Sequence, residues 1–189
     1  MLTKVTSNAG QAAVSLALVL ICLAGNAQAG EPLKPGGKFP TFSLDVLNPK
    51  DCGTTSFDSA QFVGLAPAEP APLLIVVFGA WSCKPCKRAI AHLEQLQTAQ
   101  EKPRWRYVVV VEDREEEARK KFLEHMKSLK SNAPMLADLD GLVLGRAGCE
   151  RLPCTLAANA WGIIVGYWQK YDDGIQQQLD DLVKESKDW

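Results

Sequence analysis

The sequence predicts an α/β fold in which helices flank a central mixed β-sheet and an N-terminal β-hairpin is added, and three observations carry this prediction. Residues 73–78 form a continuous apolar run of strand length, as is typical of a strand buried on both faces. From Lys84 the apolar residues recur at helical spacing, so a helix follows this strand directly. Strand and helix patterns then alternate to the C-terminus, which favours one layered domain.

The segments before this strand are short. Residues 30–40 are rich in proline and glycine and form an N-terminal arm. Residues 42–46 alternate apolar and polar side chains as a half-buried strand does, and residues 54–57 return as its hairpin partner across a turn-rich stretch at 48–53. The proline-rich residues 66–72 are a loop and not a domain boundary, because too little chain precedes them to fold alone.

The later elements follow from periodicity in the same way. The patterns indicate, in chain order, a helix from residue 84, a strand at 105–111, a helix around 118–129, a strand at 135–139, a short helix at 142–147, a hairpin of 155–159 and 163–168, and a helix around 175–183.

Composition excludes several classes of function. The chain has 189 residues, with 21 basic and 22 acidic side chains and a formal net charge of −1. Nucleic-acid binders and polybasic membrane-surface proteins show a basic excess that is missing here. No apolar run reaches the length of about 18 residues that a membrane span needs.

The first 29 residues predict export. Lys4 is their only charged residue, residues 12–24 form an apolar core, and Ala27 and Ala29 make the small-x-small pattern that signal peptidase accepts. We expect a signal peptide at residues 1–29 and a single domain at 30–189 in the periplasm or secreted, with an uncleaved anchor as the alternative. Cleavage would remove Cys22 and leave an odd number of cysteines, which indicates a free thiol or a redox residue.

A pair of cysteines stands where the first buried strand meets its helix. Cys83, Lys84, Pro85 and Cys86 open the helix, and Pro85 suits a first turn because its missing N–H costs nothing there. Unpaired backbone N–H groups and the helix dipole favour a negative group at this position, so we expect the pKa of the Cys83 thiol to lie below its usual value of about 8.5. The spacing lets the second thiol reach a mixed disulfide formed by the first.

Residues 78–86 (FGAWSCKPC) and 152–154 (LPC) resemble the thioredoxin superfamily, and most closely its exported group that includes the TlpA and ResA proteins. The resemblance covers roughly residues 39–187. It implies that Cys83 attacks disulfides, that Cys86 resolves the mixed disulfide, and that Pro153 is the cis-proline that holds the substrate backbone. The chain departs from the family in having Cys154 where threonine usually follows the proline.

The resemblance also implies a function. It predicts a periplasmic thiol:disulfide oxidoreductase that reduces or exchanges the disulfides of exported proteins. No metal and no organic cofactor is implied, and neither a nucleic-acid partner nor a permanent membrane anchor is expected once the signal is cleaved. Protein cysteines would be the substrates and a membrane protein the electron donor. Lys84 inside the motif and Trp81 just before it are candidate substrate contacts, although packing over the active-site helix would explain Trp81 equally well.

The remaining cysteines predict a second disulfide. An oxidising compartment rarely leaves three thiols unpaired, so two of Cys52, Cys149 and Cys154 should be bonded. Cys52 and Cys149 both fall in loops and are the expected pair. Cys154 would then remain a thiol near the redox pair.

Three alternatives stay open at this point. A zinc site could use Cys83, Cys86, Cys149 and Cys154, but Pro153 interrupts its second half. A peroxiredoxin would share the fold and the export, but the sequence shows no matching Pro-x-x-x-Thr-x-x-Cys stretch. A non-catalytic thioredoxin-fold binding module with a structural disulfide is the third, although so short a loop gains little stability from closure.

Overall fold

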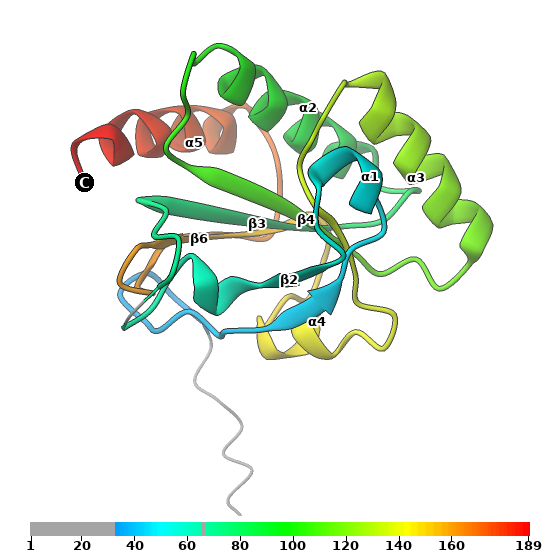
Figure 1. Cartoon of the computed structure of the whole chain (residues 1–189), viewed down its shortest axis with the longest axis horizontal. Helices are drawn as coiled ribbons and strands as arrows, with labels where there is room; N and C mark the ends of the chain where they lie inside the picture. The colour runs from blue at the N-terminus through cyan, green and yellow to red at the C-terminus, as the bar shows by residue number, and fades with distance from the viewer. Residues whose placement is uncertain (1–32, 66) are drawn as a thin grey trace, which may run out of the picture. The chain divides into compact units, whose positions relative to one another are not determined.

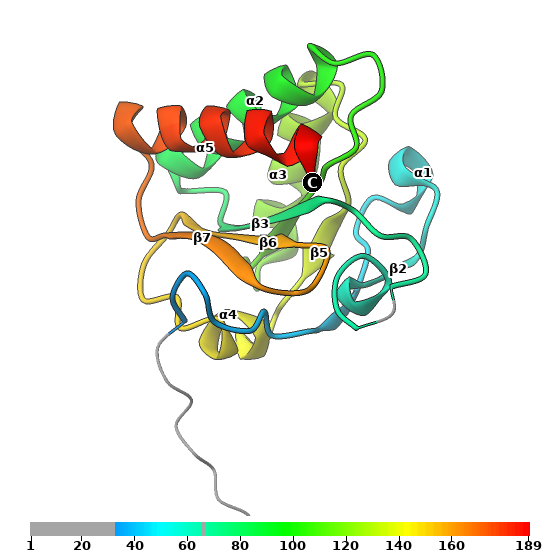
Figure 2. The same ribbon diagram turned by 90° about the vertical axis from the view of Figure 1, so that its left-hand side faces the viewer.

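A five-stranded mixed sheet in the order β5-β4-β3-β6-β7 organises the fold (Figures 1 and 2). The computed structural model describes residues 33–65 and 67–189, so the expected signal peptide lies outside the described residues. β3, β4 and β5 are parallel, and β6 is antiparallel to both of its neighbours. The strands are β3 (Leu73–Gly79), β4 (Arg106–Val111), β5 (Met135–Ala137), β6 (Cys154–Asn159) and β7 (Ile164–Trp168).

Three helices cover one face of the sheet (Figure 2). A short helix and residues from the segment 33–63 cover the other face. Because β3, β4 and β5 follow one another in one direction across the sheet, right-handed crossovers place α2 and α3 on the same face. The helices of this face are α2 (Lys84–Thr98), α3 (Glu116–Ser128) and α5 (Asp173–Glu185); α4 (Leu142–Arg146) lies on the other. Within the described residues, no helix is long and apolar enough to cross a bilayer.

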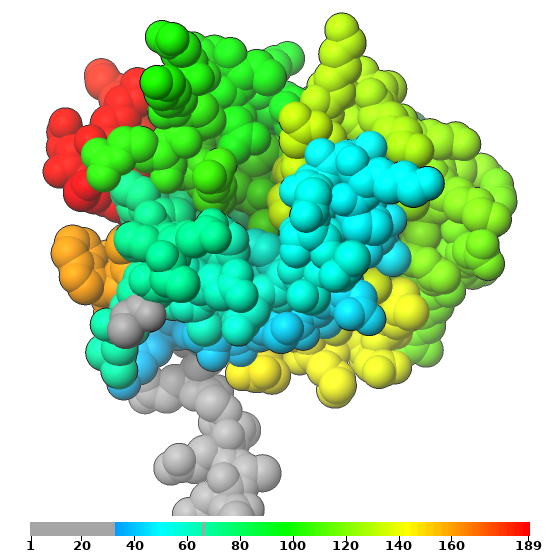
Figure 3. Space-filling model, in the orientation of Figure 1, coloured from blue at the N-terminus to red at the C-terminus, as the bar shows by residue number. Residues whose placement is uncertain are grey.

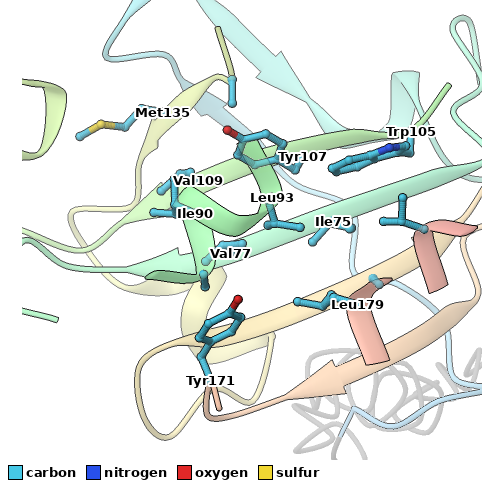
Figure 4. Close-up of a cluster of buried hydrophobic side chains, with 14 of the residues drawn as sticks. Ile75, Val77, Ile90, Leu93, Trp105, Tyr107, Val109, Met135, Tyr171 and Leu179 are labelled. Carbon is cyan, nitrogen blue, oxygen red and sulfur yellow. The ribbon is translucent and has the colours of Figure 1, made fainter. Parts of the chain in front are cut away.

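β3 separates two hydrophobic cores, as the continuous apolar run predicted. Its side chains at residues 73, 75 and 77 join the first core cluster, and those at 74, 76 and 78 join the second. Figure 4 shows Ile75 and Val77 beside Ile90 and Leu93 of α2. The exposed fraction of every residue from 73 to 78 is 0–1%, so this strand is enclosed on both faces up to the loop that leads to the cysteine pair.

The predicted N-terminal hairpin is present as a separate two-stranded antiparallel sheet of β1 (Ser43–Asp45) and β2 (Ser56–Asp58). The stretch between them, expected only as turns, contains the short helix α1 (Pro49–Cys52), and the 3-10 helices η1 (Ser59–Gln61) and η2 (Ser186–Asp188) are also present. The Asn48 side chain ties this region to β5, since its Nδ2 donates to the Ala133 carbonyl at 3.0 Å and its Oδ1 accepts from the Met135 N–H at 2.8 Å.

Candidate active site

The two cysteines of the motif lie at the N-terminus of α2. Cys83 is the N-cap residue, and its Sγ atom is bonded to that of Cys86, with the two Cα atoms 5.3 Å apart. The Cys83 Sγ accepts a hydrogen bond from the backbone N–H of Cys86 at 3.1 Å. The helix terminus therefore directs a backbone donor at this sulfur, as the position of the motif predicted.

The two sulfurs differ in their exposure to solvent. Cys83 is partly exposed, whereas the exposed fraction of Cys86 is 0%. Cys86 packs tightly against the end of β3, because a Cβ atom at position 79 would lie 3.3 Å from the Cys86 Cβ and 3.7 Å from the ring of Phe122. Gly79 thus allows this close approach. An incoming thiol or disulfide can reach Cys83 and not Cys86.

Trp81 precedes the motif and is held from two sides. Its backbone N–H donates to Asp113 Oδ2 at 2.7 Å, and the ammonium of Lys87 lies 3.9 Å from the centre of its ring. The Trp81 side chain is partly buried and packs against the first core cluster. Lys84, by contrast, is exposed on the first turn of α2.

Asp113 and Lys87 are contacts that the sequence analysis did not identify. Asp113 had a usable signal, because it follows β4 and the carboxyl ends of neighbouring parallel strands meet at one edge of a sheet. The sequence contained no such signal for the contact of Lys87 with the Trp81 ring, beyond the place of Lys87 one turn after Lys84.

Two titratable groups border this end of the sheet. Glu112 donates its backbone N–H to the Gly79 carbonyl at 3.3 Å, and burial, together with the charges of Asp138 and Asp113, raises the pKa of its carboxyl. On α3, burial and the nearby charge of Lys87 lower the pKa of His125. Uncharged forms of both groups are therefore favoured relative to free side chains.

Pro153 lies at the same end of the sheet as the motif. Cys154 opens β6 opposite Phe78 of β3, which puts the preceding residue level with Gly79. The peptide bond between Leu152 and Pro153 is cis, as the resemblance implied.

The expected second disulfide pairs different residues. Cys149 is bonded to Cys154, with Cα atoms 5.8 Å apart, and among the described residues Cys52 is the free cysteine. The prediction of a Cys52–Cys149 bridge is therefore wrong, as is that of a free Cys154. The turn at residues 150–153 brings Cys149 back to the start of β6, whereas the Cys52 sulfur lies at the end of α1, 3.3 Å from the Asn48 carbonyl oxygen. Both pairs that a zinc site would have used are bridged.

The sheet lies between the two disulfides. Cys154 belongs to the second core cluster with Phe78 and Leu156, on the face of α4. Cys86 lies beside Phe122, which belongs to the first cluster on the face of α2. The two sulfur pairs thus lie at one end of the sheet but on opposite faces.

A large cavity among the described residues lies elsewhere. It has a volume of about 720 Å³ and opens between the α1 hairpin region and the end of α2, where Figure 3 shows a hollow between the segments coloured cyan and green. Cys52, Glu94 and Tyr107 are among its lining residues, and none of its lining residues belongs to the cysteine motif. The cavity is therefore separate from the Cys83–Cys86 pair.

Comparison with known proteins supports the predicted fold. No family model and no curated protein matches the chain. A solved structure from Chlorobium tepidum, assigned as the thiol:disulfide interchange protein DsbE, is 14% identical with a TM-score of 0.66, over 82% of this chain and 98% of that one. The thioredoxin domain of a thiol-disulfide oxidoreductase from Bacteroides vulgatus is 18% identical with a TM-score of 0.61, over 80% and 99%.

A third structure is of a secreted disulfide oxidoreductase from Mycobacterium tuberculosis. It is 16% identical, with a TM-score of 0.58, and the match covers 76% of this chain and 95% of that one. These likenesses confirm the α/β fold that the sequence predicted.

Proposed function

We propose that this chain, which has a thioredoxin-like fold, is an exported thiol:disulfide oxidoreductase that uses Cys83 and Cys86. The observation that carries the proposal is the asymmetry of the pair: Cys83 is partly exposed and accepts a helix N-terminal N–H at 3.1 Å, while Cys86 is buried directly behind it. Attack on a substrate needs a sulfur that the substrate can reach, which is Cys83. Resolution needs a second sulfur that is shielded from other substrates, which is Cys86.

The proposed reaction has two exchange steps. In the reduced protein the Cys83 thiolate attacks a substrate disulfide, forms a mixed disulfide and releases one substrate thiolate, which takes up a proton. Cys86 then loses its proton and attacks the Cys83 sulfur, which releases the second substrate thiol. The product is the Cys83–Cys86 disulfide seen here, and two electrons have passed to the substrate.

The backbone N–H of Cys86 supports the first step. A thiolate, and not a thiol, is the nucleophile in disulfide exchange, so a donor that stabilises the negative sulfur increases the reactive fraction at neutral pH. The bond is made at the N-cap of a helix of 15 residues, where the helix dipole acts in the same direction.

Substrates are proposed to be cysteines of exported proteins. Pro153 lies level with Gly79, close to the motif in the sheet register, which supports a role in holding the substrate backbone. Lys84 and the Trp81 region would contact the substrate around Cys83. The periplasmic or secreted location rests on the signal pattern of residues 1–29, and the donor that restores the dithiol is proposed to be a membrane protein.

Insulin reduction with a dithiol donor tests the activity. We expect the protein to accelerate insulin precipitation, Cys83→Ala to abolish this acceleration, and Cys52→Ala to retain it as the matched control. A module that holds only a structural disulfide would show no acceleration in any form, which would refute the proposal.

Trapping tests the assigned roles and identifies clients. In Cys86→Ala the mixed disulfide at Cys83 cannot be resolved, so exported proteins should accumulate as adducts that dithiothreitol releases. Cys83→Ala is the control that should trap none. Adducts of equal amount in both variants would contradict the assignment.

A further inference from the structure

We infer that Cys149–Cys154 is a second exchangeable disulfide, which a dithiol reductant opens by attack on Cys149. This inference goes beyond the proposed function and uses none of its residues as reactants. It rests on the exposure of the two sulfur-bearing residues, on the loop between them and on the hydrogen bonds that hold that loop.

The second pair repeats the asymmetry of the first. Cys149 is partly exposed, whereas the exposed fraction of Cys154 is 0%. In both disulfides the N-terminal cysteine is therefore the one that a solvent-borne thiolate reaches, and its partner is shielded. Exchange depends on access to the attacked sulfur, so this arrangement determines which sulfur reacts.

The loop closed by this disulfide is short, so the bond restricts the unfolded chain less than a long-range disulfide would. Cys149 and Cys154 are separated by five positions in the sequence. The entropy that a crosslink removes from the unfolded state grows with the length of the closed loop, so this bond stabilises the fold less than a long-range disulfide would. The fold therefore depends less on this bond than it would on a long-range one.

Hydrogen bonds hold the start of the loop without the disulfide. The Gly148 carbonyl accepts from Tyr167 Oη at 2.7 Å, and the Glu150 N–H donates to Gln169 Oε1 at 2.9 Å. The Cys149 N–H donates to the Leu144 carbonyl at 3.2 Å. Opening the bond would thus remove the crosslink across residues 150–153, while residues 148–150 stay attached to β7 and α4. Pro153 is buried and Leu152 packs against the second core cluster, so we expect the fold to persist.

The reaction consumes one dithiol for each disulfide opened. One thiolate of the dithiol attacks the Cys149 sulfur, the bond to Cys154 breaks, and the Cys154 thiolate takes up a proton. The second thiol of the reductant then loses its proton, attacks its own mixed-disulfide sulfur and displaces Cys149 as a thiolate that is protonated in turn. Cys149 and Cys154 end as thiols and the reductant ends as a disulfide.

The segment that the bond spans contains Pro153, level with the end of β3. Reduction of the second pair would therefore remove a crosslink at the end of the sheet where the Cys83 motif lies. Since the sheet lies between the two pairs, we expect the reductant to be a separate molecule and not the Cys86 thiol of the same chain. Cys83 stands at the N-terminus of α2, where the helix dipole favours the approach of a thiolate, so exchange of Cys83–Cys86 should be the faster of the two.

The test uses the protein with Cys52, Cys83 and Cys86 changed to alanine, so that of the cysteines after residue 29 only the second pair remains. The protein is treated with dithiothreitol without denaturant and alkylated, and mass spectrometry counts the labels. We expect labels on Cys149 and Cys154 while the circular dichroism spectrum keeps its native form. Brief treatment with reduced glutathione should give an adduct on Cys149.

A disulfide that stays oxidised until the protein is unfolded in urea would overturn the inference, as would a glutathione adduct on Cys154. If the triple variant does not fold, the unsubstituted protein decides the question by peptide mapping after timed reduction. Labels should then appear first on Cys83 and Cys86 and later on Cys149 and Cys154. Labels confined to the first pair under native conditions would be the contrary result. Activity is not measured, so failure here leaves the proposed function untouched.

Discussion

The Sγ atom of Cys83 lies 3.1 Å from the backbone nitrogen of Cys86, whose N–H it accepts as a hydrogen bond. The bond joins the N-cap of α2 to its first turn. It favours negative charge on the sulfur that is also the more exposed of the two. Position in the fold, and not the motif alone, distinguishes the two cysteines.

Iodoacetamide should therefore modify Cys83 before Cys86 in the reduced protein at neutral pH. The alkylation rate follows the thiolate fraction and the access of the reagent, and both favour Cys83. Peptide mapping of samples quenched at short times measures the order. Preferential labelling of Cys86 would reverse the assigned roles of nucleophile and resolving residue.

The reduction potential of the Cys83–Cys86 couple should lie in the lower half of the range from about −270 mV for thioredoxin to about −120 mV for DsbA. Strong oxidants need several interactions that stabilise the thiolate. Here Lys84 is exposed and its charge is screened. Equilibration with glutathione measures the potential, and a value above about −150 mV would show an oxidase instead.

Lys84→Ala tests how much the charge of this lysine contributes to the reduction potential. Removing a cation near the thiolate destabilises the reduced form, so the potential should become more negative, by less than about 30 mV for one screened charge. Lys170→Ala is the control, because that lysine is exposed and pairs with Asp172 at 2.7 Å. A larger shift would mean that Lys84 contacts the sulfur directly once the bond is reduced.

Asp113→Ala should weaken the loop before the motif. The carboxylate accepts the Trp81 N–H at 2.7 Å, and losing a charged acceptor for a partly buried donor costs about 1–3 kcal/mol. We expect lower stability in urea unfolding and slower insulin reduction. Asp140→Ala, at an exposed position, is the control that should change neither. Unchanged activity in Asp113→Ala would show that Trp81 does not need this anchor.

Tyr107→Phe should destabilise the protein without affecting the motif. The buried hydroxyl bonds to the carboxylate of Glu94 and lies 2.8 Å from Ser131 Oγ, so its removal leaves buried polar groups without a partner. The expected loss is about 1–3 kcal/mol in urea unfolding. Tyr171→Phe should cost less, because that hydroxyl makes only a 3.4 Å contact with Gln176. Equal losses of stability in the two variants would contradict the importance of the Tyr107 hydrogen bonds to Glu94 and Ser131.

The sequence was sufficient to predict the features that depend on local pattern. The apolar run of β3 required burial on both faces, and the change of period at Lys84 located the helix that carries the motif. The Cys149–Cys154 bond escaped prediction because two loop cysteines look alike until the turn between them is known. Asn48 escaped it for a related reason, because it bonds to a residue that only the packing of distant segments brings near. Asp113 could have been found from its place after β4, but its bond to the Trp81 N–H depends on the path of the loop after β3.

Glu112 should make the protein less stable as the pH rises. Its carboxyl is partly buried, and one of its oxygens, Oε1, is enclosed without a hydrogen-bond partner in the described part of the chain. Burial, with smaller contributions from Asp138 and Asp113, raises the folded-state pKa above the ordinary value of 4.5. A group whose pKa is raised on folding binds its proton more tightly in the folded state. Its favourable contribution is therefore complete below pH 4.5 and is lost as the pH rises through the raised value.

Glu112→Gln should accordingly increase the free energy of unfolding at pH 7 and leave it nearly unchanged at pH 4, as measured by urea unfolding at both values. Glu116→Gln is the matched control of opposite sign, because the hydrogen bond and charge of Lys120 lower the pKa of Glu116. That substitution should remove a small stabilisation that is present above pH 4.5 and lost as the pH falls. If Glu112→Gln instead lowered stability at pH 7, the carboxylate would have to make a favourable contact when charged, and the burial that raises its pKa would not be the dominant effect.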